Sequence, residues 1–286
     1  MSTDLRGTAI RKSLMQASSV EMTPAYITRT PGAFENLAPN TRVFVTWLPG
    51  TPFDATLNAC VSLRQRGYVP VAHIAARSLR DTAHFRTICS QLVSRAQANS
   101  ILLIAGGQPE SDGMFSNTLD VLRTGIASSE GLRKIYVAGH PEGHPQASAQ
   151  TLRDTLHEKQ MLATQQGLDM ELVTQFGFDP AAMLDWEEML RKDGITLPVN
   201  LGLYGLASPQ TLLRYGLACG VGQSLRLLKT RRTRLHRWFF PCNPQSLVDA
   251  VARRIAETPD TLFRGLHFFP FGAVPKTLAW RRKLSD

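Results

Sequence analysis

The sequence has few cysteines, and no two of them lie close together. Cys60, Cys89, Cys219 and Cys242 are the four cysteines among 286 residues, and they form no C-x-x-C pair. This spacing argues against a zinc knuckle, a thioredoxin-like redox motif and a disulfide framework. Cys60 and Cys89 stand among apolar residues with helical spacing, so we expect both to be buried as small hydrophobic side chains.

Long apolar segments are also missing. No run approaches the roughly 18 to 20 apolar residues that a membrane-spanning helix needs. The first residues, MSTDLRGTAIRKSL, lack the apolar stretch of a secretory signal. We therefore expect a cytoplasmic protein with no membrane partner. A composition of 43% hydrophobic and 19% charged residues is ordinary for a globular protein and is sufficient for a sizeable core.

The motifs of several enzyme classes are absent as well. The sequence has no G-x-S-x-G, and no spacing indicates a serine or cysteine nucleophile with its base. Few carboxylates accompany the histidines at the ends of the predicted strands, which disfavours a metal centre built from histidine and acidic ligands. We expect no metal.

Positive charge is in excess, and much of it lies in one segment. The net charge is +9, and six basic residues fall between Arg226 and Arg237. The remainder of the chain is therefore only mildly basic. A solvated helix face or loop, a docking surface for nucleotide phosphates or a polyanionic tail, and a nucleic-acid contact are all compatible with this segment.

Strand-like segments alternate with helix-like segments along the chain. The predicted strands are 19–22, 42–48, 69–75, 101–107, 134–139, 170–176, 197–205 and 265–272, and the helices between them include 55–67, 79–97, 116–128 and 149–167. Strands that alternate with helices of ten or more residues pair in parallel, and eight such repeats favour a barrel over a doubly wound sheet. We predict an α/β fold with a single (β/α)8 TIM barrel over residues 1–286, in which residues 1–17 are a flexible or helical N-terminal extension.

In such a barrel the carboxyl ends of the strands converge on one mouth. The residues at these ends are Glu21, Thr46, His73, Gly106 to Gln108, His140 to His144, Gln175, Tyr204 and Phe269 to Phe271. Glu21 stands in an apolar strand, where it either pairs with a basic residue or has a raised pKa that suits a general acid. Gln175 carries both a donor and an acceptor, so it could bind the edge of a heterocycle.

Two of these clusters, HPEGHP at 140–145 and TQFGFD at 174–179, together resemble motifs of the methylenetetrahydrofolate reductase family. The resemblance extends from about residue 19 to about residue 271. It implies a (β/α)8 barrel that binds FAD noncovalently at the strand carboxyl ends. It also implies an enzyme of one-carbon metabolism that transfers hydride between NADH or NADPH and the pair methylenetetrahydrofolate and methyltetrahydrofolate, and it suggests a homo-oligomer.

The resemblance also implies roles for individual residues. Glu21 in SVEMTPAY matches the family's general acid at the pterin nitrogen, and Gln175 matches a glutamine that hydrogen-bonds the substrate. Phe176 and Phe178 match the aromatic remainder of that motif, and we place Gln108 and Tyr204 beside the substrate. The residues implied to contact the cofactor are Thr46, His73, Gly106, Gly107, Gln108, His140, His144 and Lys159.

The sequence departs from the family after the fourth strand. The usual Arg-Gly-Asp run is replaced by Gly106-Gly107-Gln108, and Asn117 stands where a tyrosine is common, although Asp120 is kept. An anion beside a flavin disfavours its anionic reduced form. We therefore predict that neutral Gln108 raises the flavin's reduction potential and favours oxidation of methyltetrahydrofolate.

Two other functions stay open at this point. The departures after the fourth strand are compatible with a barrel of the same ancestry that is flavin-free or needs a partner subunit. The segment from Arg226 to Arg237 is compatible with a protein that binds nucleic acid or another polyanion, although we expect nucleic acid least.

Overall fold

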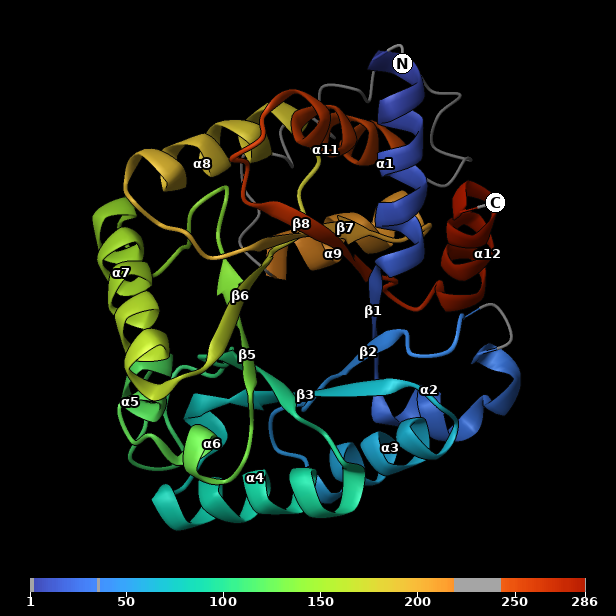
Figure 1. The fold of residues 1–286 in the computed structure, drawn as a ribbon. Helices are drawn as coiled ribbons and strands as arrows, with labels where there is room; N and C mark the ends of the chain where they lie inside the picture. Colours follow the sequence, from blue (N-terminus) through green and yellow to red (C-terminus); the bar gives the residue numbers. More distant parts are fainter. Residues whose placement is uncertain (1–2, 35–36, 219–242, 286) are drawn as a thin grey trace.

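The computed structural model describes residues 3–34, 37–218 and 243–285, which form a closed barrel of eight parallel strands wrapped by helices (Figure 1). The strands follow one another around the barrel in chain order, and this confirms the predicted (β/α)8 fold. They are β1 (Ser19–Met22), β2 (Arg42–Val45), β3 (Val69–Ala75), β4 (Ser100–Ile104), β5 (Lys134–Gly139), β6 (Asp169–Thr174), β7 (Val199–Tyr204) and β8 (Phe263–Phe269).

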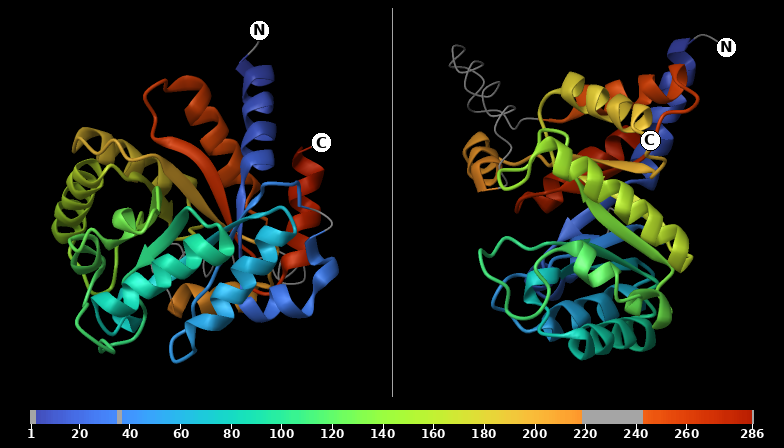
Figure 2. Two further views of the ribbon diagram at one scale, coloured as in Figure 1. Left: turned by 60° about the horizontal axis from the view of Figure 1, so that its bottom comes forward. Right: turned by 90° about the vertical axis from the view of Figure 1, so that its left-hand side faces the viewer.

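The helices cover the outside of the barrel (Figure 2). They are α1 (Thr3–Ala17), α2 (Pro24–Arg29), η1 (Pro31–Phe34), α3 (Phe53–Gln65), η2 (Ala76–Ser78), α4 (Thr82–Ala96), α5 (Thr118–Leu122), α6 (Ile126–Ser129), α7 (Ala149–Gln166), α8 (Pro180–Lys192), α9 (Pro209–Ala218), α11 (Gln245–Glu257) and α12 (Val274–Ser285). None of them, within the part of the chain described, combines the length and apolarity that crossing a bilayer requires.

The strands β2, β4, β6 and β8 end two or three residues before their predicted ends. Gly106, just past β4, has a φ of +100°, and Phe271, just past β8, has a φ of +48°. These values are incompatible with an extended strand. The polar residues that follow the four strands therefore lie in loops at the mouth of the barrel.

The predicted helix over 116–128 is in fact two short helices, α5 and α6. Gly125 lies between them with a φ of +66°, and it precedes the first turn of α6. A left-handed residue stops an α-helix, and glycine adopts this conformation without steric cost. The sequence prediction missed this break because the apolar spacing continues through it.

The barrel interior is apolar in the middle and charged at the amino ends of the strands. The middle layer is formed by Phe44, Val71, Leu102, Tyr136 and Val173. Below it, the Glu171 carboxylate pairs with Lys134, lies 4.0 Å from Arg42, and accepts a hydrogen bond from the Asn200 amide at 2.8 Å. These contacts fill the lower end of the barrel beneath the apolar layer.

The N-terminal and C-terminal helices pack side by side, as Figures 1 and 2 show for α1, α11 and α12. Arg281 of α12 is buried, and its guanidinium donates hydrogen bonds to the carbonyls of Met15 and Gln16 at 3.1 and 2.8 Å. It also donates to the Ser18 hydroxyl at 2.6 Å. Carbonyls at a helix end need such donors because they have no partner within the helix.

Candidate functional site at the barrel mouth

The parallel sheet brings the predicted site residues to one end of the barrel. β1 to β8 all run in the same direction, so their carboxyl ends form a single rim. Glu21, His73 and Tyr204 lie in the last residues of strands β1, β3 and β7, whereas Thr46 and Gln175 follow β2 and β6 directly. The structure then divides these residues into three groups with different chemistry.

The first group is a carboxyl group beside an imidazole. Glu21 Oε2 lies 3.5 Å from His73 Nε2, and the Glu21 side chain is 21% exposed. Burial raises the pKa of Glu21 to about 8 and lowers the pKa of His73 to about 3. At neutral pH both groups are therefore uncharged, and the contact is not an ion pair. A carboxyl group that keeps its proton at pH 7 is suited to act as a general acid.

Two buried polar atoms near this pair have no hydrogen-bond partner among the described residues. They are Oγ1 of Thr46, which directly follows β2, and Nε2 of His73 itself, in the adjacent strand β3. Two hydrogen bonds of 3.1 Å hold the backbone of Thr46. Its N–H donates to the Met22 carbonyl, and its carbonyl accepts from the Thr56 hydroxyl. An unsatisfied buried polar atom costs free energy, which a polar ligand would recover.

The second group consists of two histidines from the loop after β5 and a lysine from helix α7. The rings of His140 and His144 lie 5.1 Å apart, nearly perpendicular to each other. Burial, above all, lowers the pKa of His140 to about 4, with a further contribution from the charges of His144 and Lys159. Lys159 is only 6% exposed, and burial lowers its pKa to about 8. Lys159 is therefore still mostly protonated at pH 7, a buried cation suited to an anionic ligand.

The third group is an aromatic wall at the carboxyl ends of β6, β7 and β8. Phe176 and Phe178 follow β6, and their rings lie 5.8 Å apart. Phe178 packs on Tyr204 at 4.7 Å, and Phe176 packs on Phe271 at 4.9 Å. Phe269, at the end of β8, stacks on Phe271 at 6.0 Å. Such a wall provides apolar surface and ring faces for a planar ligand.

Glycine at position 202 allows this wall to approach the end of β6. A Cβ atom on Gly202 would lie 2.2 Å from the carbonyl oxygen of Thr174 and 2.8 Å from a ring carbon of Phe269. Any larger residue would displace the backbone just before Gln175. The backbone N–H of Gln175 donates to the Gly139 carbonyl at 2.9 Å. This bond fixes the backbone of Gln175 between the aromatic wall and the HPEGHP loop.

The loop after β4 does not present Gln108 as a free side chain. The side-chain amide of Gln108 donates to the backbone carbonyl of Arg77 at 2.8 Å. In return, the Arg77 guanidinium donates to the backbone carbonyl of Gln108 at 2.8 Å. Gly106 needs glycine because of its φ of +100°, whereas a Cβ on Gly107 would meet no atom within 4 Å. The space beside the Gly107 Cα atom is therefore open.

Sequence reasoning missed two residues of the site, Arg77 and His267. Arg77 belongs to no motif, and its contacts depend on a loop more than 30 residues away. His267 is fully buried in β8, where its Nδ1 lies 2.8 Å from the Ser19 hydroxyl and its Nε2 has no hydrogen-bond partner among the described residues. Consecutive side chains of a strand point to opposite faces of the sheet, so His267 and Phe268 point in opposite directions. This alternation was the signal in the sequence from which the direction of His267 could have been inferred.

A cavity of about 440 Å³ adjoins the mouth at the loops after β2, β3 and β4. Its lining combines aromatic, basic and acidic side chains, including Trp47, Phe53, Arg80, His84 and Asp112. A larger hollow of about 660 Å³ lies on the surface of α7, over Asp154 to Gln165, and contains none of the predicted site residues. Neither cavity is lined by a predicted site residue, so the mouth is favoured by the side chains that converge there and not by a cavity.

Some sequence predictions concern residues with no part in this site or outside the described chain. Cys60 and Cys89 are buried, as predicted. The basic segment from Arg226 to Arg237 lies outside the described residues, as do Cys219 and Cys242. Within the described ranges, no group of three or more His, Cys, Asp or Glu residues is arranged to hold a metal ion.

Comparison with solved structures places this barrel among known folds. No family model matches the sequence. The fold is similar to that of an uncharacterized protein from Clostridium thermocellum that binds two copies of 5-methyl-5,6,7,8-tetrahydrofolic acid, with a TM-score of 0.64 and 11% identity over 94% of this chain and 95% of that one. Dihydropteroate synthase from Thermus thermophilus also aligns, with a TM-score of 0.44 and 13% identity over 94% of this chain and 93% of that one.

Proposed function

We propose that this protein is a flavin-dependent oxidoreductase that interconverts 5,10-methylenetetrahydrofolate and 5-methyltetrahydrofolate, with NADH or NADPH as the other redox partner. The observation that carries the proposal is Glu21, a carboxyl group that burial keeps protonated at the mouth of the barrel. The Clostridium thermocellum protein supports a reduced folate as the ligand, since it has a similar fold and binds methyltetrahydrofolate.

Reduction of methylenetetrahydrofolate needs a proton as well as a hydride. The one-carbon bridge opens when one of its nitrogens is protonated and the C–N bond breaks, and the hydride then completes the methyl group. Glu21 is suited to supply that proton because its pKa of about 8 keeps it protonated at pH 7. Gln175 would hydrogen-bond the pterin edge, and Phe176 and Tyr204 would border the ring system.

The residues at the mouth also fit a noncovalent FAD. FAD would supply hydride transfer between the nicotinamide and the folate. The unsatisfied atoms of Thr46 and His73 would meet its polar groups, and Lys159 would oppose its phosphates. Gly106, Gly107, Gln108, His140 and His144 would form the remaining rim of the cofactor site.

A spectroscopic titration tests the proposal directly. We expect the purified protein to be yellow or to take up FAD, and the bound flavin to bleach anaerobically with NADH or NADPH and with methyltetrahydrofolate. A protein that binds no FAD contradicts the flavin proposal. If that colourless protein still binds methyltetrahydrofolate, the flavin-free barrel replaces it.

The variant Glu21→Gln separates proton donation from binding. It should bind FAD and be reduced by the nicotinamide as the wild type is, but it should lose at least about 100-fold in the folate half-reaction, since positioned acids contribute about 10² to 10⁴. Glu188→Gln, on the outer helix α8, is the matched control and should retain both half-reactions. Equal folate rates in the wild type and Glu21→Gln would exclude Glu21 as the acid.

A further inference from the structure

We propose that Arg77 and Gln108 form a clamp that positions the loop between β4 and α5, residues 105–117, at the barrel mouth. Gln108 is then a positioning residue for the backbone. The clamp itself is independent of the ligand, and only its effect on FAD rests on the function proposed above.

The clamp is reciprocal and reaches both ends of the loop. The side chain of each residue donates to the carbonyl of the other at 2.8 Å. Arg77 Nε also donates to the carbonyl of Ser116 at 2.9 Å. The backbone of Arg77 adds two hydrogen bonds. Its N–H donates to the Ala105 carbonyl at 3.0 Å, and its carbonyl accepts from the backbone N–H of Asp112 at 2.7 Å. One arginine therefore holds the start, the middle and the end of the loop.

This loop needs external bonds because its own sequence provides little order. Gly106 and Gly107 stand together at its start, and glycine loses more conformational freedom on folding than other residues. The guanidinium of arginine is a planar group with several fixed donors, so it can bind two carbonyls at once. Lysine has a single flexible ammonium and would not hold the Gln108 and Ser116 carbonyls in the same geometry.

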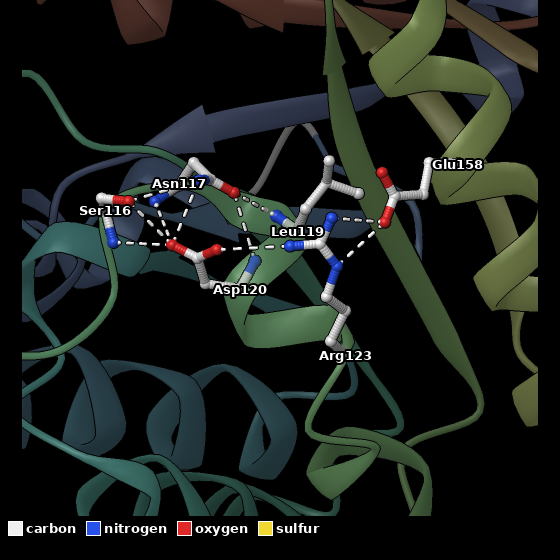
Figure 3. Close-up of polar contacts among 6 residues, drawn as sticks. All are labelled: Ser116, Asn117, Leu119, Asp120, Arg123 and Glu158. Carbon is white, nitrogen blue, oxygen red and sulfur yellow. Dashed lines mark hydrogen bonds and ion pairs between the residues drawn. The ribbon is translucent and has the colours of Figure 1, made fainter.

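The far end of the loop continues into a second set of polar contacts, which Figure 3 shows. The amide and hydroxyl of Ser116 donate to Asp120 Oδ2 at 3.0 and 2.8 Å, and the other carboxylate oxygen lies 3.6 Å from Arg123. Arg123 in turn binds Glu158 of α7 at 2.6 Å. Glu158 precedes Lys159, so the clamped loop is tied to the helix that carries the buried cation.

The charge of Arg77 also reaches the HPEGHP loop. The pKa of His144 is lowered by burial and, in addition, by the positive charge of Arg77. The clamp therefore has a readout that a general loss of stability would not reproduce. Removing the charge of Arg77 should raise the pKa of His144 toward its ordinary value.

The clamp changes what a substitution at position 108 means. Gln108→Asp, which would restore the charge typical of methylenetetrahydrofolate reductases, also removes the donor to the Arg77 carbonyl. It would place a carboxylate near that carbonyl oxygen, so the loop would shift together with the charge. Two variants of similar length separate these effects. Gln108→Met removes the donor without adding charge, and Gln108→Glu removes the donor and adds charge.

Hydrogen exchange of the loop tests the clamp in the protein without ligand. We expect both Gln108→Met and Gln108→Glu to increase amide exchange across 105–117 and to weaken FAD binding by about tenfold, the effect of losing a hydrogen bond or two. Arg77→Lys should behave like the Gln108 variants, and Arg77→Ala should raise the pKa of His144 measured by NMR. Arg95 is an exposed arginine on α4, and Arg95→Ala is the control. It should change neither the amide exchange of residues 105–117 nor the pKa of His144.

The outcomes separate the clamp from the proposed function. The clamp would be overturned if Gln108→Met had the amide exchange and the FAD affinity of the wild type, and if Gln108→Glu alone lowered the flavin potential. Position 108 would then act through its charge. Increased exchange and a raised His144 pKa in a protein that binds no FAD would support the clamp and reject the flavin.

Discussion

Burial sets the chemistry of individual side chains at the barrel mouth. Glu21 and His73 approach within 3.5 Å, yet both are neutral at pH 7 because each loses more by desolvation of its charged form than it gains from the other. Lys159 is desolvated as well, but its pKa falls only to about 8, so it keeps its charge. The mouth thus combines a proton donor, Glu21, with a buried cation, Lys159.

The pH dependence of turnover should follow the proton on Glu21. The acid form is present below its pKa of about 8 and is lost above it. The rate of methylenetetrahydrofolate reduction should therefore fall about tenfold per pH unit above 8, while flavin reduction by the nicotinamide should not. Stopped-flow rates of the two half-reactions, followed from neutral to strongly basic pH, measure this. A folate half-reaction that is flat through this range would assign the proton to another group.

Glu21 should also reduce stability at neutral and basic pH. The ordinary pKa of its carboxyl group is 4.5, and burial raises the pKa to about 8 in the folded protein. Between these values the native state holds a proton that the unfolded state does not, so the free energy of unfolding falls as pH rises. Glu21→Gln should remove this slope and be more stable at pH 8 by up to about 4 kcal/mol. Urea denaturation at pH 4.5 and pH 8 compares the two proteins.

At the scale of elements, the contacts around α5 show how a short helix is held in place. Asn117 caps its first turn by accepting from the amides of Leu119 and Asp120 at 2.8 and 3.2 Å. Asp120 accepts from the Asn117 amide in return, which completes a capping box. Burial raises the pKa of Asp120, but the hydrogen bonds from Ser116 and Asn117 outweigh burial and lower it overall.

Removing the cap of α5 should cost about 1 kcal/mol in the free energy of unfolding, the usual loss when an N-cap residue becomes alanine. Asn117→Ala is the test, and Asn117→Ser, which keeps a side-chain acceptor, should restore most of the loss. Chemical denaturation of the three proteins gives the comparison. If alanine and serine behave alike, the helix is held by Arg77 and Arg123 without its cap.

Most elements could be predicted from the sequence because their signals are local. The apolar runs of Ile101 to Leu103 and Leu201 to Leu203 are buried on both faces, and glycines such as Gly167 end the helices that precede strands. The loop contacts could not be predicted in this way. Arg77 and Gln108 are 31 residues apart in sequence, and the pairing of β3 with β4 is what brings them together.

The same division applies to the candidate site. The sequence predicted that Glu21 and His73 lie at one mouth, because strand order and parallel pairing follow from the alternation of strands and helices. It did not predict where the Gln108 side chain points. That direction depends on the backbone carbonyl of Arg77, which no sequence pattern identifies as a partner. The role of Gln108 in setting a flavin potential stays a prediction.

At the scale of the whole molecule, the charged layer at the amino ends of the strands closes the barrel. Glu171, whose side chain is 14% exposed, faces two cations, Lys134 and Arg42. Glu171→Gln should cost about 2 kcal/mol in stability, because it removes the carboxylate beside the partly buried Arg42 and leaves Lys134 with the exposed Asp169, and solvent screening limits the loss. Asp169→Asn is the control, since Asp169 contacts the same Lys134 but is 58% exposed, and it should cost less than about 1 kcal/mol. Thermal melts at low salt distinguish the two.

The closed lower end also has a kinetic consequence for Glu21. Among the described residues, charged and apolar layers lie beneath it, so we expect its proton to exchange with water through the mouth. A folate seated over the mouth would separate Glu21 from the solvent. After donating its proton, Glu21 could be reprotonated only once the product had left, which would make product release and recovery of the acid a single event in each turnover.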